Sequence, residues 1–392
     1  MAQEFSRRGF LKRTGESALA AGIAAVPLAP PDKQPEHLPI PAPPQKKLGW
    51  AVVGLGELAL GQIMPAFALC DRSRPVALVS GHPEKAKKVA EHYQINPKNI
   101  YGYENYDSLK DNSEIDVVYV VLPNSMHAEY TVRALRAGKH VLCEKPMAVN
   151  PQECRQMIDA AKEADRKLMI AYRLHYEPYN QAVIEMSRKQ AYGPIRLVSA
   201  DNVQVTKAPN IRLSHSLGGG PLGDVGVYCI NACRYITGED PVSVTGMQFR
   251  PTDDPNFAEV PDRYAFTLQF PSGILATCTA GFSAAASRSY RVFCRDGWYG
   301  LDPAYDYQGL RLHIGQGNER REIKLGQVNH FAREMDHMSQ CVAENKQPWT
   351  PGEEGLRDTL VMSAIVRASV GGGTVKLSEV QNDWPILPAP QI

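Results

Sequence analysis

Short hydrophobic runs recur through the first half of the chain, and each is followed by a turn and a stretch with helical periodicity. Runs that are apolar throughout are typical of parallel strands buried on both faces. We predict such strands at residues 48–53, 76–79, 117–121, 140–143 and 168–171. The ends of these strands converge at the carboxyl edge of a parallel sheet, where ligands bind. The pattern therefore predicts an α/β fold that begins with a doubly wound (Rossmann) domain over residues 47–172.

The pattern changes in the second half of the chain, where apolar and polar residues alternate from about Val198. Tight turns such as Asp296-Gly297 separate the predicted strands. We expect helices at residues 177–189, 224–236, 329–344 and 355–370. These elements predict an α+β domain over residues 173–392 with a mainly antiparallel open sheet. An open sheet with one helix-covered face has a second face to bury, so we expect a homo-oligomer, a dimer or a tetramer.

The first residues have the pattern of an export signal. Ser6-Arg7-Arg8-Gly9-Phe10-Leu11-Lys12 is a twin-arginine motif, and an apolar run (18–26) and small residues up to Ala29 follow it. A charged start, a short apolar core and small residues before a cleavage site are the parts of a signal peptide. We predict that residues 1–29 are this signal and that the protein is periplasmic, exported folded by the twin-arginine route. A chance Arg-Arg pair is the alternative.

Eight prolines lie between Pro27 and Pro44. Such a segment favours extended polyproline geometry, because proline fixes φ and has no N–H to donate. Residues 30–46 are therefore predicted to form a proline-rich N-terminal arm outside both domains. This arm has two interpretations: a spacer between the signal and the first domain, or an arm that lies across a neighbouring subunit.

Composition and charge narrow the classes of function. The chain has 392 residues and a formal net charge of +1, with no basic stripe, which argues against nucleic acid as a partner. The longest apolar stretch, near the N-terminus, is too short and too rich in alanine for stable membrane insertion. The eight cysteines include no C-x-x-C pair, which argues against a zinc ribbon or a disulfide scaffold. We expect small-molecule partners and no metal.

The first predicted strand runs into a G-x-G-x-x-A turn that precedes a helix. This position between strand and helix is what a dinucleotide-binding turn requires. Gly54 permits the tight turn, Gly56 lets the backbone approach a pyrophosphate, and Ala59 lets the helix lie close to the strand. The N-terminus of the helix favours the phosphates. Pro65 is expected to kink this helix or to start its next segment.

The residues after the second strand distinguish NAD from NADP. An NAD site keeps a carboxylate there for the ribose 2′-hydroxyl, and a carboxylate would repel the 2′-phosphate of NADP. This chain has Ser80, which can donate a hydrogen bond, with His82 and Lys85 just beyond it. NADP is therefore the predicted cofactor. Glu57 would oppose this choice if it pointed the same way, and Lys85 could instead lie on a solvated helix face.

Candidate catalytic side chains gather at two places. Lys145 lies between Glu144 and Pro146 at the end of a predicted strand, and Asp224 and Tyr228 share one helix face. Oxidation of a sugar hydroxyl requires removal of its proton as the hydride leaves. Tyrosine, with an ordinary pKa of about 10, needs a nearby cation to act as that base near neutral pH. Lys145 could supply the cation, and Asp224 could orient the lysine or the substrate.

Each candidate also has an ordinary structural interpretation. Lys145 could be a surface lysine, and Tyr228 could be a packed helix aromatic. Arg173 and His175, which follow the last strand of the first domain, could be polar loop residues. Gly218-Gly219-Gly220 could be a plain loop, although its flexibility suits the edge of a site.

These motifs resemble the Gfo/Idh/MocA oxidoreductases. Within that family the chain resembles most the glucose–fructose oxidoreductase branch, which has tyrosine at the position of Tyr228 where many members have histidine. The segments that carry the resemblance are Val53-Gly54-Leu55-Gly56, Leu78-Val79-Ser80-Gly81, Leu122-Pro123-Asn124-Ser125, Cys143-Glu144-Lys145-Pro146-Met147, Gly218-Gly219-Gly220 with Asp224 and Tyr228, and Pro351-Gly352-Glu353-Glu354-Gly355. The segment from Val205 to Ser216 differs from the family in detail, which leaves the identity of the sugars open.

The resemblance implies a role for each matching residue. It makes Lys145, Asp224 and Tyr228 catalytic. It assigns cofactor binding to Gly54, Gly56, Ala59, Ser80, Lys85, Leu122, Pro123, Asn124, His127, Glu144 and Lys145. It places the substrate sugar near Arg173, His175, Arg212, Asp224 and Tyr228. It also implies that the N-terminal arm embraces a partner subunit.

Three hypotheses about function follow. The first is an NADP-dependent oxidoreductase with tightly bound cofactor, which oxidises a glucose-like aldose to its lactone and reduces a fructose-like sugar by ping-pong hydride transfer. A periplasmic enzyme finds no free NADP pool, so a cofactor recycled in place removes that difficulty. The second is a sugar dehydrogenase with exchangeable NAD(P). The third is a non-catalytic sugar or nucleotide sensor, since a fold does not fix an activity, although the presence of both Lys145 and Tyr228 speaks against it.

Overall fold

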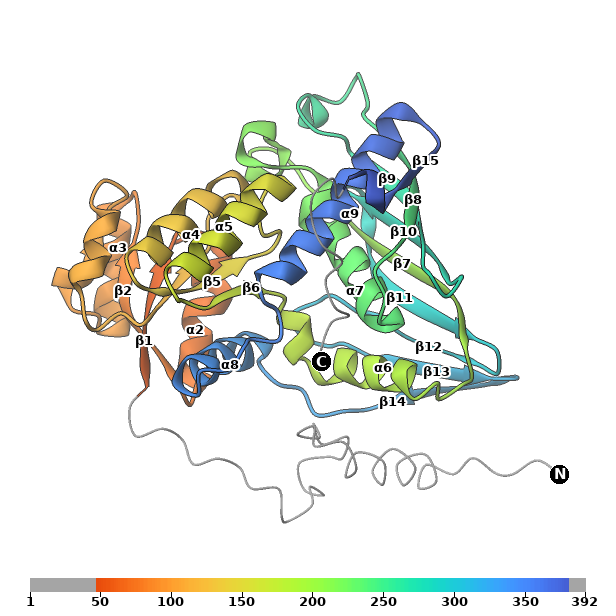
Figure 1. The fold of residues 1–392 in the computed structure, drawn as a ribbon, viewed down its shortest axis with the longest axis horizontal. Coiled ribbons are helices and arrows are strands. Elements are labelled where there is room, and N and C mark those ends of the chain that lie inside the picture. The colour runs from red at the N-terminus through yellow and green to blue at the C-terminus, as the bar shows by residue number, and fades with distance from the viewer. Residues whose placement is uncertain (1–46, 381–392) are drawn as a thin grey trace, which may run out of the picture.

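The computed structural model describes residues 47–380, which form two domains side by side (Figure 1). The first domain contains a six-stranded sheet of order β3-β2-β1-β4-β5-β6. Its strands, all paired in parallel, are β1 Leu48–Val53, β2 Ser73–Val79, β3 Ile100–Tyr101, β4 Val117–Val120, β5 His140–Glu144 and β6 Leu168–Ala171. The strand order reverses beside β1, and this is where doubly wound sheets bind ligands. The predicted Rossmann architecture is confirmed.

Helices cover both faces of this sheet. They include α3 Pro83–Tyr93, α4 His127–Arg136 and α5 Pro151–Glu163. The segment after the glycine turn is helical in three geometries, with a π-helical turn at Ala59–Ile63, α2 at Met64–Ala66 and a 3-10 turn at Phe67–Leu69. The geometry changes next to Pro65, which has no N–H to continue the hydrogen-bond ladder. β3 was not predicted, because two residues are too few to show a period.

The second domain is built on a nine-stranded sheet of order β14-β13-β12-β11-β7-β10-β9-β8-β15. Its strands are β7 Ile195–Val205, β8 Ser243–Phe249, β9 Arg263–Gln269, β10 Leu275–Gly281, β11 Ser283–Cys294, β12 Trp298–Leu301, β13 Leu312–Gln316, β14 Glu319–Ile323 and β15 Thr374–Lys376. The pairs are antiparallel except for β7 with β10. The prediction of a mainly antiparallel sheet is therefore confirmed.

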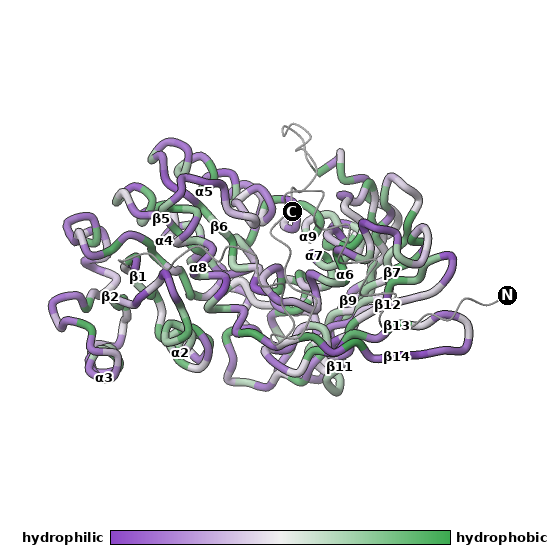
Figure 2. The backbone as a smooth tube through the Cα atoms, turned by 90° about the horizontal axis from the view of Figure 1, so that it is seen from below, coloured by the Kyte–Doolittle hydropathy of each residue, from purple (hydrophilic) through white to green (hydrophobic). Residues whose placement is uncertain are grey.

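Three helices, α6 Pro178–Arg188, α7 Val227–Thr237 and α9 Gly352–Gly371, cover one face of the second sheet (Figure 1). Hydrophobic residues follow most strands of both sheets, whereas hydrophilic residues dominate β14 and outer turns such as those around α3 (Figure 2). Within residues 47–380, no helix is long and apolar enough to cross a membrane.

Helix α8, His330–Ala343, follows β14 of the second sheet in sequence but packs on the first domain, beside α2 (Figure 1). Phe331 and Met338 of α8 belong to the same buried cluster as Trp50 of β1. The indole N–H of Trp50 donates to the Ser339 hydroxyl at 3.1 Å, and the Asp336 carboxylate accepts from the main chain at the start of β2. The chain thus returns to the first domain between β14 and α9, and α9 and β15 then complete the second domain.

Candidate active site

The glycine turn joins β1 to the helical segment at the carboxyl edge of the first sheet. Gly54 has φ +94°, and a Cβ added there would lie 2.3 Å from the Val121 carbonyl oxygen, so the position requires glycine. Ala59 is fully buried. Gly56, by contrast, is exposed, and an added Cβ would meet nothing within 4 Å. The turn is packed on its inner side and open at Gly56, which is the shape that admits a pyrophosphate.

The end of β2 lies beside this turn. The Ser80 hydroxyl accepts a hydrogen bond from the His82 N–H at 3.1 Å, so its own proton stays available to a ligand. Lys85 donates from Nζ to the carbonyl oxygen of Leu55 at 3.3 Å, which places an ammonium group against the glycine turn. Glu57 is exposed. The hydroxyl and the ammonium group are thus close to the turn, as a site for a 2′-phosphate requires.

The loop after β4 belongs to the first domain and contacts the second. Leu122 is buried and Pro123 partly buried, while the Asn124 side chain donates to the Gly218 carbonyl oxygen at 2.8 Å. His127 is fully buried, with its ring nitrogens 2.8 Å from the Pro146 carbonyl oxygen and 2.9 Å from that of Leu122. Burial lowers the pKa of His127. The structure thus places His127 between two loops of the cofactor edge rather than on the surface of the cleft.

Glu144 ends β5 directly before the candidate lysine and is 7% exposed. Its carboxylate accepts from the Tyr119 hydroxyl at 2.8 Å and from the Lys145 main-chain N–H at 3.2 Å. Burial raises the pKa of Glu144, although Lys145 opposes that effect. Glu144 therefore lies beneath the cleft and fixes the strand end that carries Lys145.

Lys145, Asp224 and Tyr228 come together, as their motifs predicted. Lys145 Nζ donates to the Asp224 carbonyl oxygen at 2.9 Å and lies 3.5 Å from the carboxylate Oδ1. It also lies 4.7 Å from the centroid of the Tyr228 ring. Arg212 Nε donates to the other carboxylate oxygen at 2.7 Å. Burial raises the pKa of Asp224, but Lys145 and Arg212 outweigh it and hold that pKa below its usual value.

The backbone around Asp224 differs from the predicted continuous α-helix. Residues Leu222–Gly226 form a π-helical turn, and α7 begins at Val227. The preceding glycines bring the chain back onto the segment of Arg212, because a Cβ at Gly219 would lie 2.4 Å from the Arg212 carbonyl oxygen. The glycine-rich stretch is therefore a close-packed connection that brings Arg212 to Asp224.

Two cations lie beside Tyr228, and they are placed differently. Within residues 47–380 the hydrogen-bond donor to this hydroxyl is Arg173, whose Nη2 lies 3.3 Å from it, whereas Lys145 Nζ faces the ring and Asp224. Arg173 is 5% exposed. Lys145, the predicted source of a cation for the phenolate, lies beside the Tyr228 ring, and Arg173 adds a second cation at the hydroxyl.

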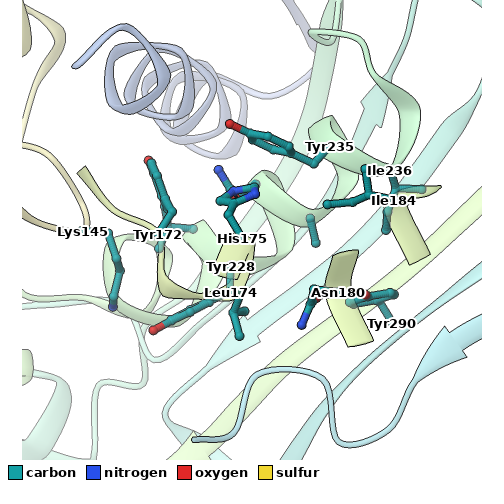
Figure 3. Close-up of a pocket in the computed structure, with 13 residues that line it drawn as sticks. Lys145, Tyr172, Leu174, His175, Asn180, Ile184, Tyr228, Tyr235, Ile236 and Tyr290 are labelled. Atoms are coloured by element: carbon teal, nitrogen blue, oxygen red, sulfur yellow. Dashed lines mark hydrogen bonds between the residues drawn. The ribbon is translucent and has the colours of Figure 1, made fainter. Parts of the chain in front are cut away.

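His175 lies in a pocket that extends from Lys145 and Tyr228 between α6 and α7. Figure 3 shows Lys145 beside Tyr228, and His175 between Tyr172 and Tyr235. His175 Nε2 is 2.8 Å from Asn231 Oδ1, and burial lowers the pKa of His175 to about 4, so that the ring is neutral at physiological pH. A neutral imidazole of this kind can hydrogen-bond but carries no charge into the site.

Comparison with known proteins identifies the chain. Two family models match it: an oxidoreductase family with an NAD-binding Rossmann fold over residues 48–172, and the GFO/IDH/MocA C-terminal domain over residues 180–300. The D-xylose 1-dehydrogenase (NADP(+)) of Haloarcula marismortui is 30% identical over 336 residues, which are 84% of this chain and 92% of that protein. The chain belongs to the Gfo/Idh/MocA oxidoreductase family. The predicted family is confirmed.

Two solved structures share this fold over more than four fifths of the chain. An aldose-aldose oxidoreductase from Caulobacter crescentus, complexed with glycerol, is 44% identical, with a TM-score of 0.82 over 84% of this chain and 100% of that chain. A 3-ketoreductase from Actinomadura kijaniata, in complex with NADP and TDP-benzene, is 26% identical, with a TM-score of 0.75 over 82% of this chain and 98% of that chain.

Three residues of this site, Tyr305, Tyr307 and His330, were not indicated by any motif or periodic pattern in the sequence, and all three contact Arg173. Arg173 Nη2 donates to the Tyr305 carbonyl oxygen at 2.6 Å, and its guanidinium lies 4.7 Å from the Tyr307 ring centroid. His330, the first residue of α8, lies 3.4 Å from Arg173 Nη1. These residues lie in loops and at a helix start more than a hundred positions from Arg173, where no periodic pattern indicates a contact. Residues 47–380 contain no group of three or more side chains suited to holding a metal ion.

Proposed function

We propose that this protein is an NADP-dependent sugar oxidoreductase in which Tyr228 exchanges a proton with a sugar hydroxyl. The observation that carries the proposal is the pair of cations on Tyr228, with Arg173 3.3 Å from its hydroxyl and Lys145 4.7 Å from its ring centroid. Nearby positive charge favours phenolate over phenol. Tyr228 can therefore accept the proton that leaves a hydroxyl and return it to the oxygen of a carbonyl.

The other side chains keep these charges in place. Asp224 balances both Lys145 and Arg212 through its two carboxylate oxygens. Arg212 has a side chain 39% exposed, so it is the cation that a sugar in the cleft can reach. The bound nicotinamide supplies the chemistry of accepting or returning a hydride. The chain's own part is to orient the sugar and to hold or move one proton at the Tyr228 oxygen.

The residues at the cofactor edge fit NADP. Gly54 lets the turn pack tightly against Val121, and Gly56 leaves the outer side of the turn open to a pyrophosphate. Ser80 and Lys85 offer a hydroxyl proton and an ammonium group where the 2′-phosphate would lie, and no carboxylate ends β2. The relatives from Haloarcula marismortui and Actinomadura kijaniata, named with NADP, support the same cofactor.

We further propose that the cofactor stays bound while two sugars react in turn, the first aldose being oxidised to its lactone and the second sugar reduced. The name of the Caulobacter crescentus protein, an aldose-aldose oxidoreductase, supports a sugar-to-sugar reaction. In such a cycle the hydride and the proton taken from the first sugar are both given to the second.

One experiment tests this cycle. Purified protein is mixed with single aldoses and ketoses, with no cofactor added, and the absorbance of its own NADPH is followed. We expect aldoses to raise the absorbance and an acceptor sugar to lower it again. Protein that releases no nicotinamide nucleotide on denaturation, and is idle until NADP is supplied, would contradict the cycle. It would establish the second candidate, a dehydrogenase with exchangeable cofactor, which the name of the Haloarcula relative favours.

The open face of the second sheet supports the proposed homo-oligomer. Leu197 on β7 is opposite Leu275 on β10 and Phe293 on β11, and the three are 48%, 41% and 36% exposed. Adjacent exposed apolar side chains of this kind mark an association surface. We expect light scattering to give the mass of a dimer or larger, and a Leu197→Glu variant to give a smaller species.

The signal peptide (1–29) and the proline-rich arm (30–46) lie outside the described residues. Periplasmic location by the twin-arginine route stays a proposal that rests on the sequence. If the twin-arginine motif directs export, replacement of Arg7 and Arg8 by lysine should keep the protein in the cytoplasmic fraction.

A further inference from the structure

We propose that Arg173 is a catalytic residue of this protein, whose guanidinium stabilises the phenolate of Tyr228 while the proton is transferred. The inference rests on the proposed function, because it names the group that makes Tyr228 a base in that reaction. It differs from the role that the resemblance implies, in which Arg173 contacts the sugar.

The two cations beside Tyr228 are placed differently. Arg173 Nη2 donates to the hydroxyl oxygen, which is the atom that carries the charge of a phenolate. Lys145 Nζ lies 4.7 Å from the ring centroid and donates to the Asp224 carbonyl oxygen at 2.9 Å. A donor aimed at the atom where charge develops stabilises that charge more than one held over the ring. The geometry therefore favours Arg173 as the partner of the phenolate.

Arg173 is fixed by groups that cannot neutralise it. Its Nη2 donates to the Tyr305 carbonyl oxygen at 2.6 Å and its Nη1 to the Asp306 carbonyl oxygen at 3.3 Å. Its guanidinium lies 4.7 Å from the Tyr307 ring centroid and 5.6 Å from that of Phe331. Main-chain oxygens and aromatic faces hold a guanidinium in place without taking its charge. The contacts that fix Arg173 thus leave its guanidinium charged beside the Tyr228 hydroxyl.

The charge of Arg173 is secure although the site is buried. Burial lowers the pKa of Arg173, but Tyr228 and Tyr307 raise it above its ordinary value. Burial and the charge of Arg173 lower the pKa of His330 to about 2, so this neighbour is neutral. The other titratable and charged groups around Arg173 and Tyr228 are Glu144 and Lys145 at the end of β5, Glu177 at the start of α6, Arg212 and Asp224 from the second domain, and Glu334 on α8.

The proton balance is simple. The sugar O–H bond breaks, its proton goes to the Tyr228 oxygen, and the hydride leaves the sugar carbon for the cofactor. Arg173 keeps all its protons throughout and only changes the relative energies of phenolate and phenol. In the reverse direction Tyr228 returns the same proton to the carbonyl oxygen of the second sugar.

The test is the pH dependence of hydride transfer in a single turnover, measured as NADPH absorbance at saturating aldose. We compare the wild type with Arg173→Met and Arg173→Lys. Arg133→Met is the matched control, because Arg133 also lies over tyrosine rings, 4.9 Å from the Tyr106 centroid, but near the far end of α4. NADPH fluorescence of each variant reports that the fold and the cofactor site are intact.

We expect Arg173→Met to move the acid limb of the profile to higher pH by about one unit or more, since an opposite charge at this range has effects of that size. At a pH below both limbs the rate then falls about tenfold or more, and it recovers at high pH, whereas a merely structural loss would lower the rate at every pH. Arg173→Lys should move the limb less, because one ammonium group cannot span the Tyr305 and Tyr228 oxygens. Arg133→Met should keep the wild-type limb.

Other results would overturn the inference. An unshifted limb with a raised KM for the aldose would assign Arg173 to sugar binding instead. If Arg173→Met does not fold, Arg173→Gln also removes the charge, and an unshifted limb in that variant decides against the proposal in the same way. A wild-type protein that oxidises no sugar would refute the proposed function itself, so the two failures are distinguishable.

Discussion

The two sides of the cleft are assembled in different ways. The cofactor side consists of short segments that directly follow strands of the first sheet, such as Gly54 after β1 and Ser80 after β2. The catalytic side gathers Lys145, Arg173 and Tyr228 from three elements, and main-chain oxygens from a distant loop hold the arginine. Cofactor binding thus depends on backbone conformations encoded locally, whereas proton transfer depends on charge separations set by tertiary packing. Substitutions on the two sides should therefore separate binding from chemistry.

The strongest test of that separation is Tyr228→Phe. Removal of the hydroxyl removes the group that carries the proton, so kcat should fall by about 100-fold or more. The affinity for NADPH, measured by fluorescence titration, should stay within about twofold of the wild type. Tyr264→Phe, which alters a buried tyrosine on β9, is the control and should keep full activity. Equal activity in the two variants would show that Tyr228 does not carry the proton.

The glycine turn offers a paired comparison on the cofactor side. Gly54→Ala should lower the free energy of unfolding by about 2 kcal/mol or more, because φ is positive and the Cβ would lie 2.3 Å from the Val121 oxygen. Gly56→Ala should leave stability within about 0.5 kcal/mol, because its Cβ meets nothing within 4 Å, and yet weaken NADP binding. Urea unfolding of cofactor-free protein measures the free energy of unfolding of both variants, and fluorescence titration measures their affinity for NADPH. Equal stability of the two variants would contradict the described turn.

Ser80→Asp should change the choice of cofactor without changing the chemistry. A carboxylate at the end of β2 repels a 2′-phosphate and accepts from a 2′-hydroxyl, so the preference for NADP over NAD should fall by about tenfold or more. The comparison requires Kd values for both nucleotides on protein stripped of its cofactor. Ser272→Asp, in an exposed turn, is the control. An unchanged preference would show that the 2′-phosphate does not lie at Ser80.

The smallest expected effect concerns Glu334 on α8. This carboxyl is fully buried, neither oxygen has a hydrogen-bond partner in the described part of the chain, and burial together with Glu144 raises its pKa well above the usual value. In the folded state the group keeps its proton at a pH where the unfolded chain loses it. Its contribution to stability is therefore full below about pH 4.5 and declines as the pH rises toward the folded pKa.

Glu334→Gln removes this pH dependence. The variant should unfold at a higher temperature than the wild type at pH 8, with the difference shrinking toward pH 4. Glu322→Gln, on exposed β14, should follow the wild type at both values. A difference that grows toward acid pH would show that Glu334 is ionised in the folded protein.

The parallel sheet could be predicted because its strands are continuous apolar runs: the ranges 48–53 and 168–171 coincide with β1 and β6. β2 begins earlier than predicted, at Ser73, because its polar first residues still pair with Leu48 and Gly49. A continuous apolar run indicates which residues are buried. It does not indicate polar residues that join the same strand through main-chain hydrogen bonds alone.

The catalytic side was predicted only in part. Strand-end and helix-face arguments brought out Lys145, Asp224 and Tyr228, and the structure places them in contact. The same arguments assumed an α-helix where a π-helical turn holds Asp224, and they could not show that Arg173 reaches the Tyr228 hydroxyl. That contact depends on Tyr305, whose main-chain oxygen carries no sequence signature at all.

Helix α8 has a consequence for any attempt to use the two halves separately. A fragment cut after residue 172 would lose Phe331 and Met338, and the side of its sheet around Trp50 would be bare to water. Such a fragment should aggregate rather than bind nucleotide. A chimera that exchanges the cofactor half between relatives must therefore carry residues 330–343 along with it, although they lie far downstream in the gene.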